Sequence, residues 1–460
     1  MYRFFIFLIF AISICSCKDN SGIAPMDKKP FTLITLDPGH FHAALVQKSM
    51  YSSVDSNVFV YAPLGGDLTM HLSRIENYNT RSDSPTKWHE IVYNNPDYFE
   101  KMIEEKKGNV VILSGNNRIK SDYIFKSLEA GLNVFVDKPL IIDYKDFDQL
   151  KASFALAKEK NILLYDIMTE RYEMATQLQK LFSMNKDVFG TLINGSPKEP
   201  AGYIESVHHF YKIVSGNVLV RPQWFLDDLQ QGEGIADVMT HLVDLIQWEC
   251  FPDQIIDTND IKINEATHWP TALTATQFNT ITKSSQFPSF LQNSVVKDSI
   301  LQVYSNGEIN YQIRGKYFKT RALWNYQAPE GGGDTHYSLL RGTKANLIVR
   351  QGIDEKYKPT LYIEPLNPND TTLKTIIQNQ LKLTERELPG IAIEQVAKGY
   401  KLIIPTALQE GHEAHFGQVM KKFLHYLEHH DMPGWEVPNT ITKYYTTTKA
   451  LNMARMIQTK

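Results

Sequence analysis

The chain has 460 residues, which exceeds what one typical hydrophobic core holds, so we expect two domains. Hydrophobic residues make up 43% of it, which is enough to fill both cores. The 48 basic and 51 acidic residues leave a formal net charge of -3, and no basic run is interleaved with aromatic residues. We therefore expect a globular protein and exclude nucleic acid as a partner.

The N-terminal stretch MYRFFIFLIFAISICSC, residues 1–17, predicts an export signal. Its apolar run over residues 4–14 is too short to remain as a transmembrane helix. The ending I-C-S-C resembles the bacterial lipobox, which implies a lipoprotein signal peptide and a lipid on Cys17. A plain signal peptide, the alternative, would still send the chain out of the cytoplasm. We expect a lipid-anchored protein of the bacterial cell envelope, on its periplasmic face or at the cell surface.

Residues 18–30 are polar, contain Gly and two prolines, and predict a flexible tether between the lipid and the folded part. Acyl chains on Cys17 would supply the membrane anchoring. After cleavage and acylation only Cys250 keeps a free thiol, so we expect no internal disulfide.

From residue 31 to 168, β-rich apolar runs alternate with amphipathic segments, which favours a parallel sheet covered by helices. A helix is expected over residues 122–130, with Ser121 as its cap and Gly131 as its left-handed end. A second helix near 144–159 repeats apolar residues at helical spacing. The predicted strands lie at 31–36, 57–62, 109–114, 133–138 and 161–168.

After about residue 170 hairpin signals replace the helices, and we expect a mostly antiparallel sheet. In LQVYSNGEINYQI, the pair Asn306-Gly307 is predicted to form a tight turn between two strands. Helical stretches near 413–429 and 440–456 close the chain. The expected fold class is α/β. The expected domains are residues 31–168 and residues 169–460.

Two segments carry residue types suited to catalysis. Lys138 stands at the carboxyl end of a predicted parallel strand, the edge where ligands bind in open α/β sheets. If residues 231–248 form a helix, then Asp237, His241 and Asp244 fall on one stripe. A histidine flanked by carboxylates could act as a general base, because its pKa lies near neutrality. The plain alternatives are a surface lysine and a solvated helix face.

The order of these motifs resembles the Gfo/Idh/MocA oxidoreductases. Asp137-Lys138-Pro139 is similar to the family's E-K-P, and residues 114–117 (SGNN) take the place of its T-P-N-x loop. Gly232-Glu233-Gly234, followed by Asp237, His241 and Asp244, is similar to its glycine-rich turn followed by D-x-x-x-H-x-x-D. A narrower resemblance, to lipoprotein members of the family, covers DPGHFHAAL, DKPL, YDIMTERYE and SVHHFYK.

The resemblance implies a Rossmann domain, then an α/β domain with a large, mostly antiparallel open sheet, a tightly bound NAD or NADP, and a small carbohydrate substrate. It implies that Lys138 contacts the reacting hydroxyl and the nicotinamide, that His241 moves the hydroxyl proton, and that Asp237 orients the substrate or the imidazole. A homo-oligomer through the C-terminal sheet is also predicted. The implied cofactor residues are Gly39, His40, Phe41, Ser114, Asn116, Asn117, Asp137 and Lys138.

The glycine-rich loop of such a domain is largely replaced. D-P-G-H-F-H at residues 37–42 keeps only Gly39, the middle glycine, which lets backbone approach a pyrophosphate. Asp37 would set a negative charge beside phosphates, and His42 would push the following helix away from its strand. The second strand ends without an acidic residue for a ribose hydroxyl, although Arg74 could meet a phosphate.

The H-x-H spacing of His40 and His42 also raises the possibility of a metal site, together with other histidines and acids. An amidohydrolase begins in this way, but its barrel needs eight strand-helix units, and the hairpins after residue 170 contradict that. We therefore predict no metal ion, and histidines that bond to the backbone or shape an altered cofactor loop.

Residues 206–216, SVHHFYKIVSG, predict the first strand of the second domain, facing the nicotinamide side of the cleft. His208 and Lys212 lie an even number of residues apart, so both could point to one face and contact a sugar. A solubilising edge strand is the alternative. Asp244 is the third predicted substrate residue, and Asp334 in a glycine-rich loop is a further candidate.

An exported dinucleotide enzyme has no free cofactor pool, so its cofactor should stay bound and be recycled. One sugar could be oxidised while another is reduced. Alternatively, transient oxidation of a hydroxyl could assist cleavage of a glycosidic bond before the hydride returns, as in a redox-neutral glycosidase. The alternatives from another class are a cofactor-free lyase or hydratase acting on keto-sugars, and a carbohydrate-binding lipoprotein.

Overall fold

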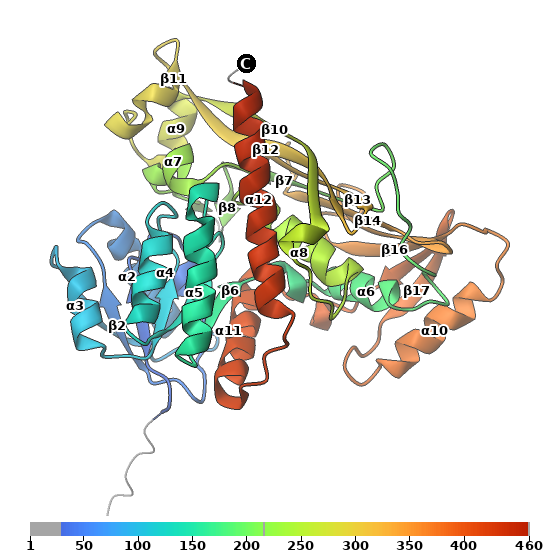
Figure 1. Cartoon of the computed structure of the whole chain (residues 1–460), viewed down its shortest axis with the longest axis horizontal. Helices are drawn as coiled ribbons and strands as arrows, with labels where there is room; N and C mark the ends of the chain where they lie inside the picture. Colours follow the sequence, from blue (N-terminus) through green and yellow to red (C-terminus); the bar gives the residue numbers. More distant parts are fainter. Residues whose placement is uncertain (1–28, 215–216, 459–460) are drawn as a thin grey trace, which may run out of the picture.

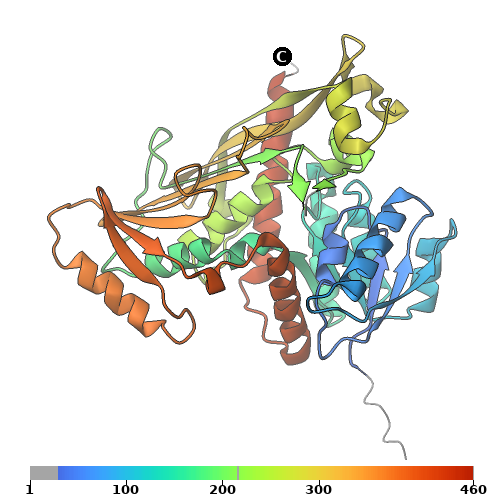
Figure 2. The same ribbon diagram turned by 180° about the vertical axis from the view of Figure 1, so that it is seen from behind.

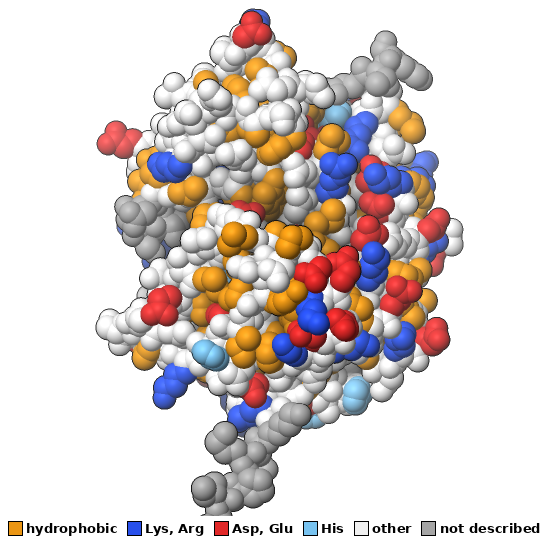
Figure 3. Space-filling view, turned by 90° about the vertical axis from the view of Figure 1, so that its left-hand side faces the viewer, with side chains coloured by type: hydrophobic (Ala, Val, Ile, Leu, Met, Phe, Trp, Pro, Cys, Tyr) orange, Lys and Arg blue, Asp and Glu red, His pale blue; other side chains and the backbone are white. Residues whose placement is uncertain are grey.

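A computed structural model describes residues 29–214 and 217–458, so the predicted signal peptide and Cys17 lie outside the described residues. Two lobes lie side by side, and helix α12 (Glu436–Gln458) runs between them (Figure 1). On the side shown in Figure 3, hydrophobic side chains gather along the seam between the upper and lower parts, next to a group of acidic and basic side chains. No helix in the described ranges is long and apolar enough to cross a membrane.

The first lobe holds a six-stranded parallel sheet in the order β3-β2-β1-β4-β5-β6. All residues of β1 and β4 are buried, as expected for a parallel sheet covered by helices on both faces. The sequence prediction missed only β3, an edge strand whose side chains are largely exposed. The strands are β1 Leu33–Leu36, β2 Asn57–Tyr61, β3 His89–Tyr93, β4 Val110–Leu113, β5 Asn133–Asp137 and β6 Leu164–Ile167. The helices are α1 His42–Val46, α2 Gly66–Thr80, α3 Tyr98–Glu105, α4 Lys120–Glu129 and α5 Phe147–Glu159.

The second lobe is built on a ten-stranded sheet in the order β10-β12-β13-β7-β14-β15-β16-β18-β17, with β11 paired to β12. Its neighbours are antiparallel except for the β13-β7 pair, which is parallel. The strands are β7 Gly202–His209, β10 Ile261–Thr274, β11 Val295–Val296, β12 Ile300–Ile313, β13 Lys316–Asn325, β14 Thr335–Arg341, β15 Ala345–Gln351, β16 Thr360–Pro365, β17 Ala392–Val396 and β18 Gly399–Ile403. A small ladder joins β8 Ile213–Val214 and β9 Asn217–Val218. The helices before α12 are α6 Met174–Ser183, α7 Asp228–Gln231, α8 Met239–Cys250, α9 Ala275–Thr282, α10 Leu373–Leu383 and α11 His412–His429.

The chain returns to the first lobe near its end. Helix α11 buries Phe416, Val419 and Phe423 in the same core as Phe135 of β5. Burial of each such side chain is worth about 1.5–3 kcal/mol. Helix α12 then packs against β10 and α8 on one side and α5 on the other (Figure 2). The predicted second domain, residues 169–460, therefore completes the core of the first and fixes the two lobes together.

The hairpin predicted at Asn306-Gly307 is wrong. Strand β12 runs straight through this pair, and the chain turns instead at Arg314-Gly315, where both φ angles are positive, at 51° and 76°. That pattern suits a two-residue hairpin turn. Gly307 is needed for close packing, because a Cβ there would lie 2.5 Å from Cγ1 of Ile235.

Of three smaller predictions at the ends of elements, one is confirmed and two change. Gly131 ends α4 with φ 84°, as predicted, but Ser121 lies inside that helix and does not cap it. The helix expected over residues 231–248 begins only at Met239, so Asp237 lies in the turn before it. Because backbone carbonyls of Glu233 and Gly234 receive the amides of this turn, its geometry stays close to helical.

Candidate active site

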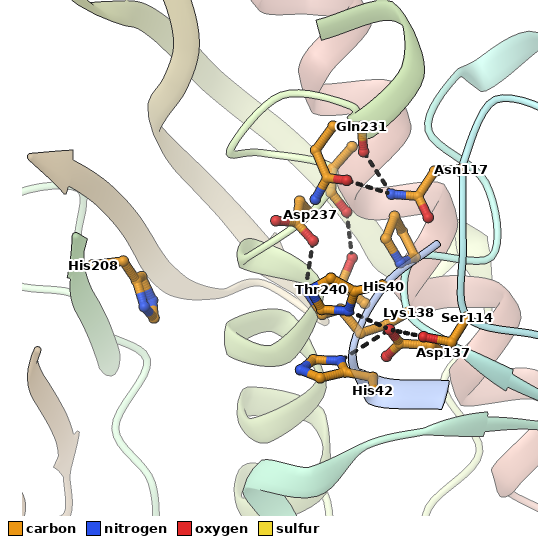
Figure 4. A network of polar contacts seen from close by, with 12 residues as sticks. His40, His42, Ser114, Asn117, Asp137, Lys138, His208, Gln231, Asp237 and Thr240 are labelled. Atoms are coloured by element: carbon orange, nitrogen blue, oxygen red, sulfur yellow. Dashed lines mark hydrogen bonds and ion pairs between the residues drawn. The ribbon is translucent and has the colours of Figure 1, made fainter. Parts of the chain in front are cut away.

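The carboxylate of Asp137 lies where three loops of the first sheet meet. Its Oδ2 atom is 2.9 Å from His42 Nδ1, 3.3 Å from His40 Nδ1 and 3.0 Å from Ser114 Oγ (Figure 4). Asp137 ends β5, Ser114 follows β4, and the two histidines follow β1. The carboxyl ends of three neighbouring strands thus build this cluster, at the edge where open α/β sheets bind ligands.

Burial sets the protonation of this cluster. It lowers the pKa of His40, and that of His42 well below its usual value, so both rings are neutral. We assign the Nδ1 proton from the hydrogen-bond network, since each ring then donates to Asp137. Burial alone would raise the pKa of Asp137, but His42 and His40 hold it well below its usual range. The carboxylate is therefore ionised and held by three donors.

Lys138 and Asp237 form an ion pair that joins the two lobes, Nζ to Oδ1 (Figure 4). Their side chains are 11% and 9% exposed. Burial lowers the pKa of Lys138, but the charges of Asp237 and Asp137 raise it more, and the resulting pKa lies above its usual value. Lys138 is therefore a cation that can donate hydrogen bonds and cannot act as a base.

Lys120, which the sequence did not single out, fixes the backbone on both sides of Lys138. Its buried Nζ donates to the carbonyl oxygens of Asp137 at 2.9 Å and Pro139 at 3.1 Å, and to Oδ1 of Asn117 at 2.5 Å. Burial lowers its pKa to about 8. The sequence gives no signal for this role, because a lysine on an amphipathic helix usually reaches solvent.

His241 lies in the first turn of α8 with a half-buried ring. Its Nδ1 finds no hydrogen-bond partner among the described residues. Burial, then the charges of Lys138 and His412, lower its pKa well below the usual value. A neutral imidazole with a free nitrogen beside an ammonium group has the form that a general base requires. His412, the first residue of α11, was not predicted, because it stands far along the chain in no recognisable motif.

A second carboxylate faces the cleft from the other lobe. Asp334 accepts hydrogen bonds from His209 Nδ1 at 2.9 Å and His208 Nδ1 at 3.2 Å, and it pairs with Lys212. His208 stands apart from the other labelled residues (Figure 4). The prediction that His208 and Lys212 share a strand face is wrong, because β7 ends at His209. Both side chains nevertheless meet at Asp334, the further candidate of the sequence.

A small pocket adjoins Asp237. Its glycine-rich turn packs tightly, since a Cβ on Gly234 would lie 1.9 Å from the carbonyl oxygen of Ser305. Aromatic walls combined with polar groups such as Asp237, Glu233 and Ser305 are typical of small-molecule sites. Three aromatic rings and the turn line the pocket: Phe210, Phe225, Trp324 and residues 232–234.

The altered loop of residues 37–42 packs closely against neighbouring segments at the place where a dinucleotide would bind. A Cβ on Gly115 would lie 2.2 Å from the carbonyl oxygen of Asp37, and one on Gly39 would lie 3.1 Å from the ring of Trp224. Asp37 has a φ of 45°, in the region that favours glycine. Burial raises its pKa to about 6, and Tyr123 donates to its Oδ2 at 3.3 Å. Its negative charge is thus partly suppressed.

The residues around this loop fit a dinucleotide. The groups that would bind its phosphates differ from those of the full glycine fingerprint. Helix α1 has only five residues, so it offers little dipole. A small pocket adjoins Gly39, His40 and Phe41, and Arg74 from α2 lines it beside them. Arg74 and the backbone at Gly39 would therefore hold the pyrophosphate in place of a helix N-terminus.

Asp244, which was predicted to contact the substrate, lies in a buried ion network. It is 2% exposed, and Arg171 donates to both its oxygens, at 2.6 Å and 2.7 Å. Lys443 of α12 adds a bond at 3.0 Å and also binds Asp166 at 2.7 Å. Both oxygens of Asp244 are therefore used in a buried ion network that joins the helices.

Asn116 and Asn117 lie at the rim of the first sheet, where they were predicted to line the cofactor pocket. Asn116 Nδ2 donates to Gln230 Oε1 at 2.7 Å, and Asn117 Nδ2 donates to the carbonyl oxygen of Gln231 at 2.7 Å. Their amides thus tie this loop to the second lobe. A contact with the cofactor stays a prediction.

His40, His42 and Asp137 also offer three metal-ligand atoms within 4.8 Å of one another. Two ammonium groups would repel a divalent cation at this position. Lys120 binds the backbone of Asp137, and Lys138 is the next residue in the chain. The hydrogen bonds described above satisfy the carboxylate without a metal ion. The absence of a metal stays a prediction.

Comparison with known proteins agrees with this arrangement. Residues 178–455 match the family model described as "Putative oxidoreductase C terminal domain", and residues 68–166 match "Oxidoreductase family, NAD-binding Rossmann fold". None of the curated proteins matches the chain.

Solved structures extend the likeness over nearly the whole chain. A putative oxidoreductase from Parabacteroides merdae is 50% identical, with a TM-score of 0.90 over 93% of this chain and 98% of that one. Levoglucosan dehydrogenase in complex with NADH and levoglucosan is 11% identical, with a TM-score of 0.58 over 93% and 97%. GenD2 from gentamicin A biosynthesis, in complex with NAD, is 11% identical, with a TM-score of 0.54 over 92% and 94%. The last two share the fold. With its E-K-P-like and D-x-x-x-H motifs at one cleft, the chain belongs to the Gfo/Idh/MocA family of NAD-binding oxidoreductases.

Proposed function

We propose that the protein oxidises a hydroxyl group of a small carbohydrate with a tightly bound NAD or NADP, and that the hydride returns to the substrate within the same cycle. The observation that carries this proposal is the Lys138–Asp237 pair near His241, with Asp237 lining an aromatic pocket. The likeness to levoglucosan dehydrogenase supports the carbohydrate class.

The side chains divide the work at the reacting hydroxyl. A bound nicotinamide would supply the hydride chemistry. Lys138 donates a hydrogen bond to the hydroxyl oxygen and stabilises the negative charge that develops there. His241 accepts the hydroxyl proton, because its imidazole ring is neutral and only half-buried. Asp237 fixes the position of the Lys138 ammonium group.

Redox-neutral cleavage needs more proton transfers than simple dehydrogenation. A ketone on the sugar acidifies the neighbouring C–H, a base removes that proton, and the glycosidic bond then breaks. His241 releases the hydroxyl proton to solvent and then takes the C–H proton, and the imidazolium formed in this step returns a proton to the leaving oxygen. The predicted export of the chain supports recycling of the cofactor.

One observation favours the cofactor-free alternative, a lyase or hydratase acting on keto-sugars. The ring of Trp224 lies against Gly39, and α1 is a single turn, so the dinucleotide groove is partly covered. Retention of dinucleotide on the purified protein separates the two functions.

The test of the proposed function uses the soluble chain that starts after Cys17. It is incubated, without added cofactor, with levoglucosan and with a panel of p-nitrophenyl glycosides, and products are followed by mass spectrometry. We expect many turnovers with no net accumulation of reduced nicotinamide, and loss of product in His241→Asn. His425→Asn, on an exposed face of α11, is the matched control. One reduced cofactor per product, with dependence on added NAD, would instead show a net dehydrogenase.

We also propose that Cys17 carries a lipid that anchors the protein in the cell envelope, and that copies associate through the large sheet. The lipobox-like I-C-S-C supports the first proposal. Incorporation of labelled palmitate into the wild type and not into Cys17→Ser tests the anchor. Light scattering on the soluble chain tests the oligomer.

A further inference from the structure

A segment of the second lobe crosses the mouth of the cofactor groove. We call residues 219–231 the strap. It is tied to the first lobe near its middle and at its C-terminal end: Trp224 Nε1 donates to Asp67 Oδ2 at 3.0 Å, and Asn117 Nδ2 donates to the carbonyl oxygen of Gln231 at 2.7 Å. The strap therefore covers the groove between these two points.

Trp224 covers the one glycine that the altered loop has kept. A Cβ placed on Gly39 would lie 3.1 Å from Cζ2 and 3.3 Å from Nε1 of the indole, and 3.1 Å from Oδ2 of Asp67. In a dinucleotide-binding loop, the face of this glycine is where the pyrophosphate approaches the backbone. The indole and a pyrophosphate cannot both occupy that face, so the ring must move when a dinucleotide enters.

The space beside the indole is suited to the phosphates. Arg74 of α2 and Arg221 of the strap line the same pocket as Gly39, and Nε and Nη2 of Arg221 also donate to the carbonyl oxygens of Phe210 and His209. Phe225 of the strap also lines it. A dinucleotide that displaced the indole would thus meet cations from both lobes, and the strap would close over it.

We propose that Trp224 is a cofactor-contacting residue supplied by the second lobe, and that, positioned by Asp67, it controls entry and release of the dinucleotide. The inference rests on the proposed function. Opening the strap breaks a hydrogen bond to a carboxylate and exposes an aromatic ring, so both association and dissociation are slow. Slow release is what an exported enzyme needs to keep its cofactor.

The test measures association and dissociation rates of NADH and of NADPH by stopped-flow fluorescence on the soluble chain. We expect Trp224→Ala to speed both rates by about tenfold or more, since a hydrogen bond to a charged group is worth about that factor. Trp224→Phe keeps a ring and loses the N–H donor, so it should fall between. Trp269→Ala, on β10 outside the strap, is the control and should match the wild type.

Each outcome is decisive. Rates that are equal in the wild type and Trp224→Ala would overturn this inference and leave the cofactor-dependent function standing. If Trp224→Ala bound dinucleotide and the wild type did not, the strap would be supported as a gate. The proposal that the wild type carries a bound cofactor would then be overturned. No binding by either protein, with both folded by circular dichroism, would overturn the inference together with the proposed function.

Discussion

Asp237 and Asp244 lie seven residues apart in one motif. Both form ion pairs, but the two ion pairs have different roles. Asp237 has one partner, Lys138, and the pair lies at the edge of a pocket with about a tenth of each side chain exposed. Asp244 is saturated by Arg171 and Lys443 and lies out of reach of solvent. An ion pair left open on one side can act on a ligand, whereas a saturated one holds helices together. The predictions below separate these two roles.

The largest effect on stability is expected from Lys443→Met. This change leaves Asp166 and Asp244 as buried carboxylates with one cation fewer, because the Lys443 side chain has no solvent exposure. Loss of one partner from a buried ion pair costs about 3–5 kcal/mol of unfolding free energy. Urea denaturation followed by circular dichroism measures it. Lys151→Met, at an exposed pair, is the control, and a loss under about 1 kcal/mol in Lys443→Met would contradict a structural role.

His241→Asn should cost activity and leave stability nearly unchanged. The variant removes the general base, which contributes about 10²–10⁴-fold to a rate. Because His241 Nδ1 has no partner among the described residues, its loss breaks no hydrogen bond there. Single-turnover rates and melting temperatures measured side by side test the prediction. A variant that lost stability and activity in proportion would place His241 with the structural network.

The two centres should also differ in their response to pH. The pKa of His241 is well below usual, so the base stays neutral and kcat/KM should remain flat from about pH 8 to pH 5.5. The pKa of Asp244 is held below its model-compound value of 3.8, so its stabilising charge is present above that pH and lost as the pH falls below it. Parallel profiles of kcat/KM and of unfolding free energy measure both. An acid limb in kcat/KM with a pKa between about 6 and 7 would show an unperturbed histidine.

The smallest effect is expected from removing metal ions. If His40, His42 and Asp137 are joined by hydrogen bonds alone, dialysis against a chelator changes neither the melting temperature nor the turnover. Elemental analysis of the purified protein is the accompanying measurement. One equivalent of a transition metal, lost in His42→Ala, would contradict the hydrogen-bonded cluster.

The sequence predicted the first sheet well, because its buried parallel strands are continuous apolar runs. Lys138 was placed correctly for the same reason, since it directly follows such a run. Asp244 was predicted to be a substrate residue because helical spacing puts it on the same stripe as Asp237, while its cations lie far away in the sequence, at Arg171 and Lys443. Local pattern carries no information about such distant partners.

Packing explains the other errors. Asn306-Gly307 has the composition of a turn, but a glycine is needed at residue 307 because the Ile235 side chain packs against it. Lys120 and His412 reach the site through the fold and belong to no motif. The strap over Gly39 joins segments that lie well apart in the sequence, so only the structure could show it.

The most direct test of the central claim is the dinucleotide content of the purified soluble chain. The protein is denatured, and the supernatant is assayed for NAD and NADP by mass spectrometry. The account predicts close to one dinucleotide per chain, retained through purification behind Trp224. An empty protein that also fails to bind either dinucleotide when it is added would contradict the account, and the Lys138–Asp237 site would then belong to a cofactor-free enzyme.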